Sequence, residues 1–145
     1  MAPTLRQPVR ILLVDDDPVF RELLAFVLRS DLGAEIVGMA GDGARGVELA
    51  VELRPDVVVM DLRMPLMDGF DATRSIVSAV DGAHVLVVSS STDSMDVERA
   101  KRAGAAGYVP KELAVADLSG EIERLRPAGR ASNESGQLRL RRAAL

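Results

Sequence analysis

Acidic residues, a hydroxyl and a lysine follow four short aliphatic segments of this sequence. Asp15 and Asp16 come directly after one segment, Asp61 after another, Ser89 ends a third, and Lys111 follows a fourth. Carboxylates that converge in one pocket repel each other and favour a hard cation such as Mg²⁺, which prefers oxygen ligands. A carboxylate can also accept a phosphoryl group as an acyl phosphate, while a lysine and a hydroxyl hold that group. The residue types therefore suit magnesium-assisted phosphoryl transfer, if the fold brings them together.

The apolar pattern predicts five strands. Short runs rich in Val, Ile and Leu occupy residues 9–14, 35–40, 56–60, 84–88 and 106–109. Continuous apolar runs suit strands that are covered on both faces, as the strands of a parallel sheet are.

Helical spacing fills the stretches between these runs. It is clearest where Phe20, Leu24 and Leu28 recur on one face, behind Asp17 as N-cap and Pro18 in the first turn. Further helices are expected at residues 43–53, 69–80, 93–103 and 112–125, with Asp68 as a cap and with Gly33, Gly82 and Gly104 where helices stop. Five strand–helix repeats indicate an α/β fold, a doubly wound parallel sheet with helices on both faces.

In open α/β sheets, ligands bind at the carboxyl ends of the strands. The acids, the hydroxyl and the lysine all follow predicted strands, so we expect them to form one polar cluster at this edge of the sheet.

Length and composition limit the alternatives. The chain has 145 residues, 48% hydrophobic and 28% charged, which is enough for one domain with a real core. The absence of cysteine excludes a disulfide scaffold, a thiolate zinc site and a cysteine nucleophile, and the single histidine, His84, leaves no partner for a histidine metal site. Because no apolar run approaches the ~20 residues that span a bilayer, we expect a soluble, cytoplasmic protein without membrane contact.

Charge is distributed unevenly. Residues 1–126 carry 14 Lys and Arg against 21 Asp and Glu, whereas residues 127–145 carry 4 against 1. An acidic body argues against non-specific nucleic-acid binding, so we expect no nucleic acid to contact this chain. The stretch 127–137 is rich in Pro, Gly and Ser, and we interpret residues 127–145 as a linker or tail.

The motifs match a known family in order and spacing. The acidic pair Asp15-Asp16, Asp61 with its following Met-Pro and Asp-Gly, Ser89, and the segment Gly-Tyr-Val-Pro-Lys that ends at Lys111 resemble a receiver domain of the bacterial two-component response regulators. The resemblance covers residues 8–126 and implies the flavodoxin-like receiver fold, a five-stranded parallel sheet in the order 2-1-3-4-5.

The resemblance also implies a role for each residue. Asp61 would be the phospho-acceptor, and Asp16 a direct ligand of Mg²⁺, with Asp15 acting through water. Asp61 and the backbone carbonyl of Arg63 would complete the metal site. The phosphoryl-binding and switch residues would be Ser89, Lys111 and the aromatic Tyr108. If a phosphoryl group draws Ser89 inward, Tyr108 is placed to follow, and residues 93–125 become the output surface.

The implied function is a phospho-accepting signalling switch, not an enzyme for an external metabolite. It would take a phosphoryl group from the phosphohistidine of a sensor histidine kinase, change its partner-binding surface, and lose the group by hydrolysis. The resemblance leaves room for a homodimer formed on phosphorylation. We expect the receiver part of a DNA-binding transcriptional regulator; the alternative is a stand-alone receiver that acts by protein contact.

Two rival interpretations remain open from the residues alone. Gly41, Gly43 and Gly46 match the GxGxxG pattern of dinucleotide-binding loops, although that pattern normally occupies the first strand–helix unit. Asp15 and Asp17 have the spacing of an aspartate-nucleophile phosphatase, although the chain has little room for the cap domain of such an enzyme.

Overall fold

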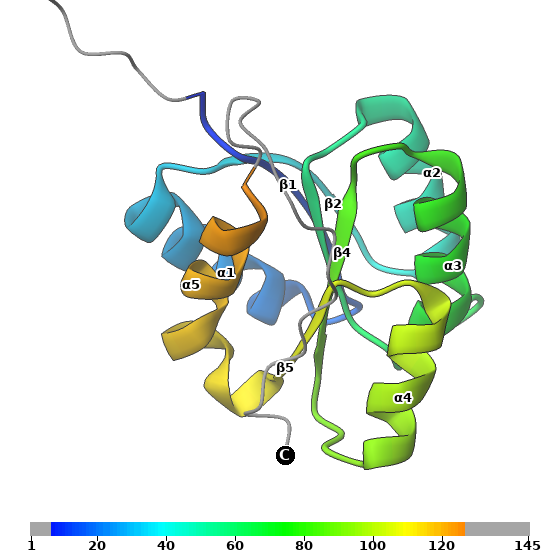
Figure 1. The fold of residues 1–145 in the computed structure, drawn as a ribbon. Helices are drawn as coiled ribbons and strands as arrows, with labels where there is room; N and C mark the ends of the chain where they lie inside the picture. Colours follow the sequence, from blue (N-terminus) through cyan, green and yellow to red (C-terminus); the bar gives the residue numbers. More distant parts are fainter. Residues whose placement is uncertain (1–6, 127–145) are drawn as a thin grey trace, which may run out of the picture.

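The computed structural model describes residues 7–126, so the predicted linker or tail at 127–145 lies outside the described residues. Five parallel strands form one sheet in the order β2-β1-β3-β4-β5 (Figure 1). The strands are β1 (Arg10–Val14), β2 (Glu35–Ala40), β3 (Val57–Met60), β4 (His84–Ser89) and β5 (Gly107–Pro110). The helices are α1 (Pro18–Leu32), α2 (Gly43–Leu53), α3 (Gly69–Ala79), α4 (Ser94–Ala103) and α5 (Ala114–Leu125).

The predicted fold class and strand order are confirmed, with small differences at two helix boundaries. A 3₁₀ turn, Lys111–Leu113, precedes α5, which therefore begins at Ala114. Helix α3 ends at Ala79 with Val80 as its C-cap, so Gly82 (φ 83°) serves the turn into β4 instead of the end of the helix. The 3₁₀ turn matters for the site because it begins at Lys111, the first residue after β5.

Two hydrophobic layers sandwich the sheet. Helices α1 and α5 cover one face, and α2, α3 and α4 cover the other (Figure 1). Residues alternate between the two faces along each strand: Ile11 and Leu13 of β1 pack toward α1 and α5, whereas Leu12 and Val14 pack toward the opposite layer. Burial on both sides explains why the strands have continuous apolar sequences.

Aspartate side chains cap four helices where they leave the carboxyl edge of the sheet. Asp17, Asp42, Asp68 and Asp93 each accept a hydrogen bond from a backbone N–H in the first turn of α1, α2, α3 and α4. The capping roles predicted for Asp17 and Asp68 are therefore confirmed. These caps anchor the loops that carry the polar residues.

Packing requires two of the three glycines of the GxGxxG pattern, Gly43 and Gly46. A Cβ atom on Gly43 would overlap the backbone carbonyl oxygen of Met67, and one on Gly46 would lie 2.9 Å from Cγ1 of Val14. Helix α2 therefore approaches β1 and the loop after β3 so closely that only glycine fits at these two positions. Close packing accounts for these two glycines without a dinucleotide.

This close approach makes Gly43→Ala destabilising, by about 1–3 kcal/mol, because backbone must shift to admit the methyl group. Gly120→Ala, within α5, is the matched control, since a Cβ there meets nothing within 4 Å. The control is expected to stabilise the protein by about 0.5–1 kcal/mol through helix propensity. Urea unfolding of both variants checks the opposite signs; a stable Gly43→Ala protein would contradict the packing argument.

Candidate functional site

Three carboxylates converge at the carboxyl edge of the sheet. One oxygen from each of Asp15, Asp16 and Asp61 lies within 4.8 Å of the others. Asp15 and Asp61 are each only 5% exposed, whereas Asp16 is exposed to solvent. A hard cation could thus be held between two buried oxygens and one that faces water, and the all-oxygen donor set fits Mg²⁺.

Backbone contacts hold the two buried acids in place. The Asp15 N–H donates to the carbonyl of Ala40 on β2, and the Asp61 N–H donates to the carbonyl of Val14 on β1. Both acids thus extend the ladder of the sheet by one residue beyond the strands. Arg21 of α1 donates from Nη1 to the Asp15 carbonyl at 2.6 Å, which ties the first turn of α1 to the acidic loop.

Lys111 supplies the nearby positive charge. Its Nζ lies 3.1 Å from Oδ2 of Asp15 and 3.7 Å from Oδ2 of Asp61, and 4.8 Å from the ring centroid of Phe20 on α1. Burial alone would lower the pKa of Lys111, but the hydrogen bond to Asp15 and the charge of Asp61 outweigh burial and raise it. The ammonium therefore stays charged beside the acids.

Asp61 carries the most perturbed carboxyl of this cluster. Burial and the neighbouring charge of Asp15 raise the pKa of Asp61 from 3.8 to about 6, against the lowering effects of Lys111 and of the Leu62 N–H, which donates to Oδ1 at 2.9 Å. The charge of Asp16 raises it further. The ionised Asp61 is therefore a carboxylate held at a cost in free energy, which a bound cation would relieve.

Ser89 and Tyr108 belong to a second, adjoining group of contacts. The Ser89 Oγ accepts from the backbone N–H of Ser91 at 3.1 Å, and the Tyr108 hydroxyl donates to the Ser91 carbonyl at 2.9 Å. Tyr108 is fully buried in the core between the sheet and α2, α3 and α4. The ring thus lies inside the core in this structure, and the switch role expected for Tyr108 stays a prediction.

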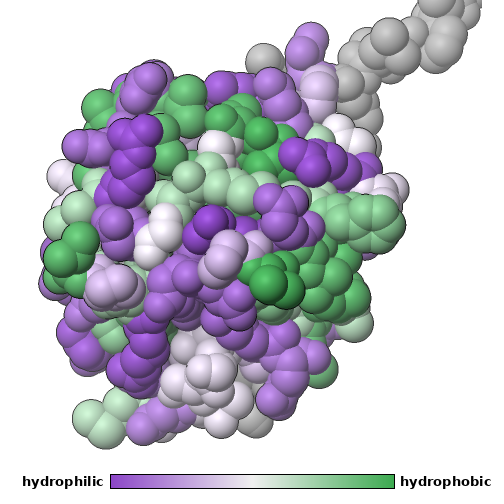
Figure 2. Space-filling view, turned by 180° about the vertical axis from the view of Figure 1, so that it is seen from behind, coloured by the Kyte–Doolittle hydropathy of each residue, from purple (hydrophilic) through white to green (hydrophobic). Residues whose placement is uncertain are grey.

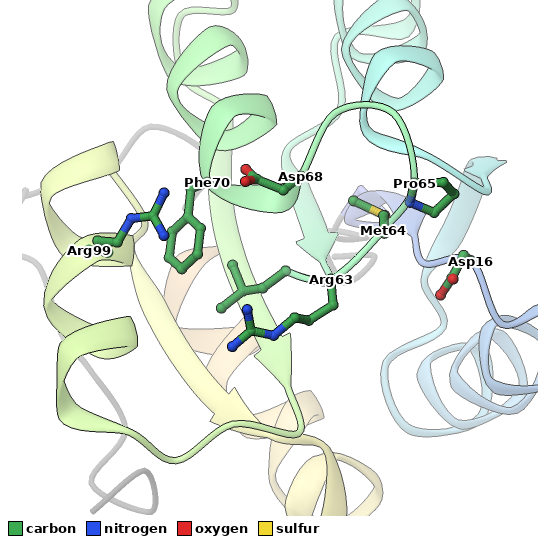
Figure 3. A pocket seen from close by; sticks show the side chains of 8 residues that line it. Asp16, Arg63, Met64, Pro65, Asp68, Phe70 and Arg99 are labelled. Atoms are coloured by element: carbon green, nitrogen blue, oxygen red, sulfur yellow. The ribbon is translucent and has the colours of Figure 1, made fainter.

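Arg63, two residues after Asp61, turns its side chain away from the acids. Its Nη2 lies 2.9 Å from Oδ2 of Asp96 on α4. Figure 3 shows this side chain directed away from Asp16, on the side where Arg99 of α4 lies, in a groove of about 360 Å³. The role predicted for Arg63 concerns its backbone carbonyl, and no contact tests that role.

Three residues that contact the site were not identified from the sequence. Phe20 belongs to the apolar face of a helix, and neither Arg21 nor Asp96 is part of a motif. All three lie in the first turn of a helix, which is the one signal that could have pointed to them, but their contacts depend on how the helices pack. Asp15, Asp16, Asp61 and Lys111, in contrast, lie together as predicted.

The raised pKa of Asp61 predicts a pH-dependent effect on stability. Because the folded-state pKa lies above the unfolded value, the ionised group costs stability above about pH 6, and this cost disappears as the pH falls through about 6 toward 3.8. In metal-free protein, Asp61→Asn should therefore raise the free energy of unfolding at pH 8 by on the order of 2 kcal/mol, and by almost nothing near pH 4.

Urea unfolding between pH 4 and pH 8 in the presence of a chelator checks this difference. Asp81→Asn, at an exposed position outside the cluster, controls for the loss of one negative charge. A stability difference for Asp61→Asn that stays constant across this range would contradict the assigned burial and repulsion.

Comparison with known proteins agrees with the geometry. The model of the response regulator receiver domain family matches residues 11–123. The transcriptional regulatory protein PdtaR from Mycobacterium tuberculosis is 43% identical over 116 residues, which cover 80% of this chain and 56% of that protein. A protein-glutamate methylesterase/protein-glutamine glutaminase from Myxococcus xanthus is 41% identical over 131 residues, which cover 88% of this chain and 37% of that protein.

A solved structure shares the whole architecture. The signal receiver domain of NarL from Mycobacterium tuberculosis superposes with a TM-score of 0.78 at 32% identity, over 82% of this chain and 96% of that chain. The present chain spans about half, or less, of the length of the two curated relatives. The family match, the sheet order and the acidic cluster beside Lys111 lead to one conclusion: the chain belongs to the response regulator receiver domain family.

Proposed function

We propose that Asp61 accepts a phosphoryl group from the phosphohistidine of a sensor histidine kinase. The observation that supports this most directly is the buried carboxylate of Asp61, which lies within 4.8 Å of Asp15 and Asp16 and 3.7 Å from the Lys111 ammonium. In the transfer, an oxygen of Asp61 forms a bond to phosphorus while the phosphorus–nitrogen bond to the histidine breaks, and the imidazole keeps the electron pair.

Asp15, Asp16 and Asp61, with the backbone carbonyl of Arg63, would hold the Mg²⁺ ion. Bound there, Mg²⁺ would neutralise charge on the phosphoryl oxygens. The Lys111 ammonium, 3.7 Å from Oδ2 of Asp61, would pair with another of these oxygens. Ser89 would donate its hydroxyl to the phosphoryl group, since its oxygen only accepts in the present contact with the Ser91 N–H and the O–H remains available as a donor.

The surface of α1 offers a contact area for the kinase beside this site. Val19, Leu23 and Phe26 are 76%, 43% and 68% exposed, and their spacing puts them along one side of α1, whose N-cap is Asp17. Seen from behind, a continuous hydrophobic area lies on the half of the molecule that carries α1 and α5 (right in Figure 2). An apolar strip that starts at the phosphorylation site suits a helical partner that must present a histidine there.

The relatives suggest how the switch is used. By analogy with PdtaR, we propose that this receiver regulates transcription as part of a longer protein, with a stand-alone receiver as the alternative. The methylesterase relative instead suggests an enzymatic output. The present chain itself would promote only its own phosphorylation and dephosphorylation. None of the helices within residues 7–126 has the length and hydropathy needed to cross a membrane. We propose a cytoplasmic location. We also propose that phosphorylation leads to a homodimer.

Direct phosphorylation tests the acceptor. Incubation with acetyl phosphate and Mg²⁺ is expected to add one phosphoryl group, seen as about 80 Da by mass spectrometry and removable by hydroxylamine, because an acyl phosphate forms at Asp61. Asp61→Asn should abolish the label, whereas Asp68→Asn, which alters only the cap of α3, should retain it. Equal labelling of the Asp61→Asn protein would exclude Asp61 as the acceptor.

Thermal unfolding tests the metal site. At about ten times its dissociation constant, Mg²⁺ should raise Tm by about 3–6 °C, since binding to the folded state stabilises it by mass action. Asp16→Ala should remove most of this rise, and Asp81→Ala, outside the cluster, should leave it intact. A full response to Mg²⁺ in the Asp16→Ala protein would show that Asp16 is not a ligand.

A further inference from the structure

The ammonium of Lys111 lies against an aromatic ring as well as against two carboxylates. Its Nζ is 3.1 Å from Oδ2 of Asp15, 3.7 Å from Oδ2 of Asp61 and 4.8 Å from the ring centroid of Phe20. The Lys111 side chain is 25% exposed, and Phe20 is half-buried against the layer that contains α1 and α5. Because the face of an aromatic ring is negative, the ring adds a third attraction at the same ammonium.

The loop that carries the acids also fixes the position of Phe20. The Asp17 N–H donates to Oδ1 of Asp15 at 2.8 Å, and Oδ1 of Asp17 in turn accepts from the N–H of Phe20 at 3.2 Å. Lys111, which contacts both the Phe20 ring and Asp15, completes a closed circuit of contacts. The first turn of α1, the acidic loop and the turn after β5 are therefore held to one another.

We propose that Phe20 is a positioning residue for phosphoryl transfer: its ring holds the Lys111 ammonium beside Asp61 when a metal ion and a phosphoryl group engage the carboxylates. The role rests on the proposed function of Asp61 as the acceptor, and it adds the residue that keeps Lys111 in place. Phe20 acts through Lys111 and not on the phosphoryl group itself.

The three contacts of the ammonium differ in how phosphorylation would change them. Oxygens of Asp15 and Asp61 would contribute to holding Mg²⁺, and one oxygen of Asp61 would carry the phosphoryl group, so both carboxylates would attract Lys111 less. The Phe20 ring is uncharged and binds no Mg²⁺, so its attraction stays the same with or without these ligands. A lysine side chain loses much rotational freedom when its ammonium is held. Without the ring, this ordering would accompany phosphoryl binding, which would become weaker.

Beryllofluoride, a mimic of the phosphoryl group, measures the effect without a kinase. In calorimetric titrations with Mg²⁺ present, Phe20→Leu is expected to bind beryllofluoride about three- to tenfold more weakly than wild type, as for the loss of a partly shielded cation–π contact. Phe20→Tyr keeps the aromatic face and should bind within about twofold of wild type. Val27→Ala, roughly 10 Å further along α1, is the matched control for lost packing on this helix and should bind like wild type.

The proton resonances of Lys111 test the contact by itself, without Mg²⁺ or beryllofluoride. The face of an aromatic ring shields nearby protons, so the ε-methylene protons of Lys111 should resonate upfield of those of Lys101, the other lysine of the sequence, which is exposed on α4. Phe20→Leu should remove this difference, whereas Phe20→Tyr and Val27→Ala should keep it. Coincident resonances of the two lysines in wild type would exclude the contact.

The affinities separate this role from the proposed function. Equal affinities of wild type and Phe20→Leu would overturn the role of Phe20 and leave Asp61 as the acceptor. A Phe20→Tyr protein that binds as weakly as Phe20→Leu would also overturn it, since the shape of the side chain and not its aromatic face would then matter. No binding of beryllofluoride by wild type would overturn the proposed function, and this role with it.

Discussion

Mutual repulsion between carboxylates in a confined space is the constraint on which this structure depends. Asp15 and Asp61 are almost completely buried, a third acid lies within 4.8 Å, and the pKa of Asp61 rises to about 6 as a result. Such an arrangement persists only if the surrounding fold is stable enough to hold it. Lys111 offsets part of the repulsion, and a cation or a phosphoryl group with its cation would change the balance further. The cluster is thus the part of the fold whose free energy a bound cation would change most.

Packing in the remainder of the fold offsets the destabilising effect of this cluster. Both faces of the sheet are covered by aliphatic layers, and the acids continue the backbone ladder beyond the strands. Glycine permits the tightest approaches: a Cβ on Gly69 would overlap the carbonyl oxygen of Asp61, just as one on Gly43 would overlap that of Met67. The loop after β3 is therefore packed by both α2 and α3, and Asp61 at its start has little freedom to move away from its neighbours.

Side-chain contacts also connect the acidic cluster to helix α4. The acidic cluster joins β1, β3 and the turn after β5, whereas the contacts of Ser91 and Asp96 join β4, β5 and α4. Arg63 belongs to both regions, because its backbone follows Asp61 and its side chain pairs with Asp96. A change of charge at Asp61 can therefore reach α4 through short-range contacts, without a large movement of the core.

The sequence by itself determined the elements and the meeting of Asp15, Asp16, Asp61 and Lys111. Strand and helix periods and capping aspartates are local signals, and in a parallel sheet residues that follow different strands must share one edge. The contacts of Phe20 with Lys111, of Arg21 with Asp15 and of Arg63 with Asp96, together with the inward position of Tyr108, were decided only by tertiary structure. These contacts join side chains from separate elements, and they depend on how each helix packs and turns against the sheet, which no local pattern encodes.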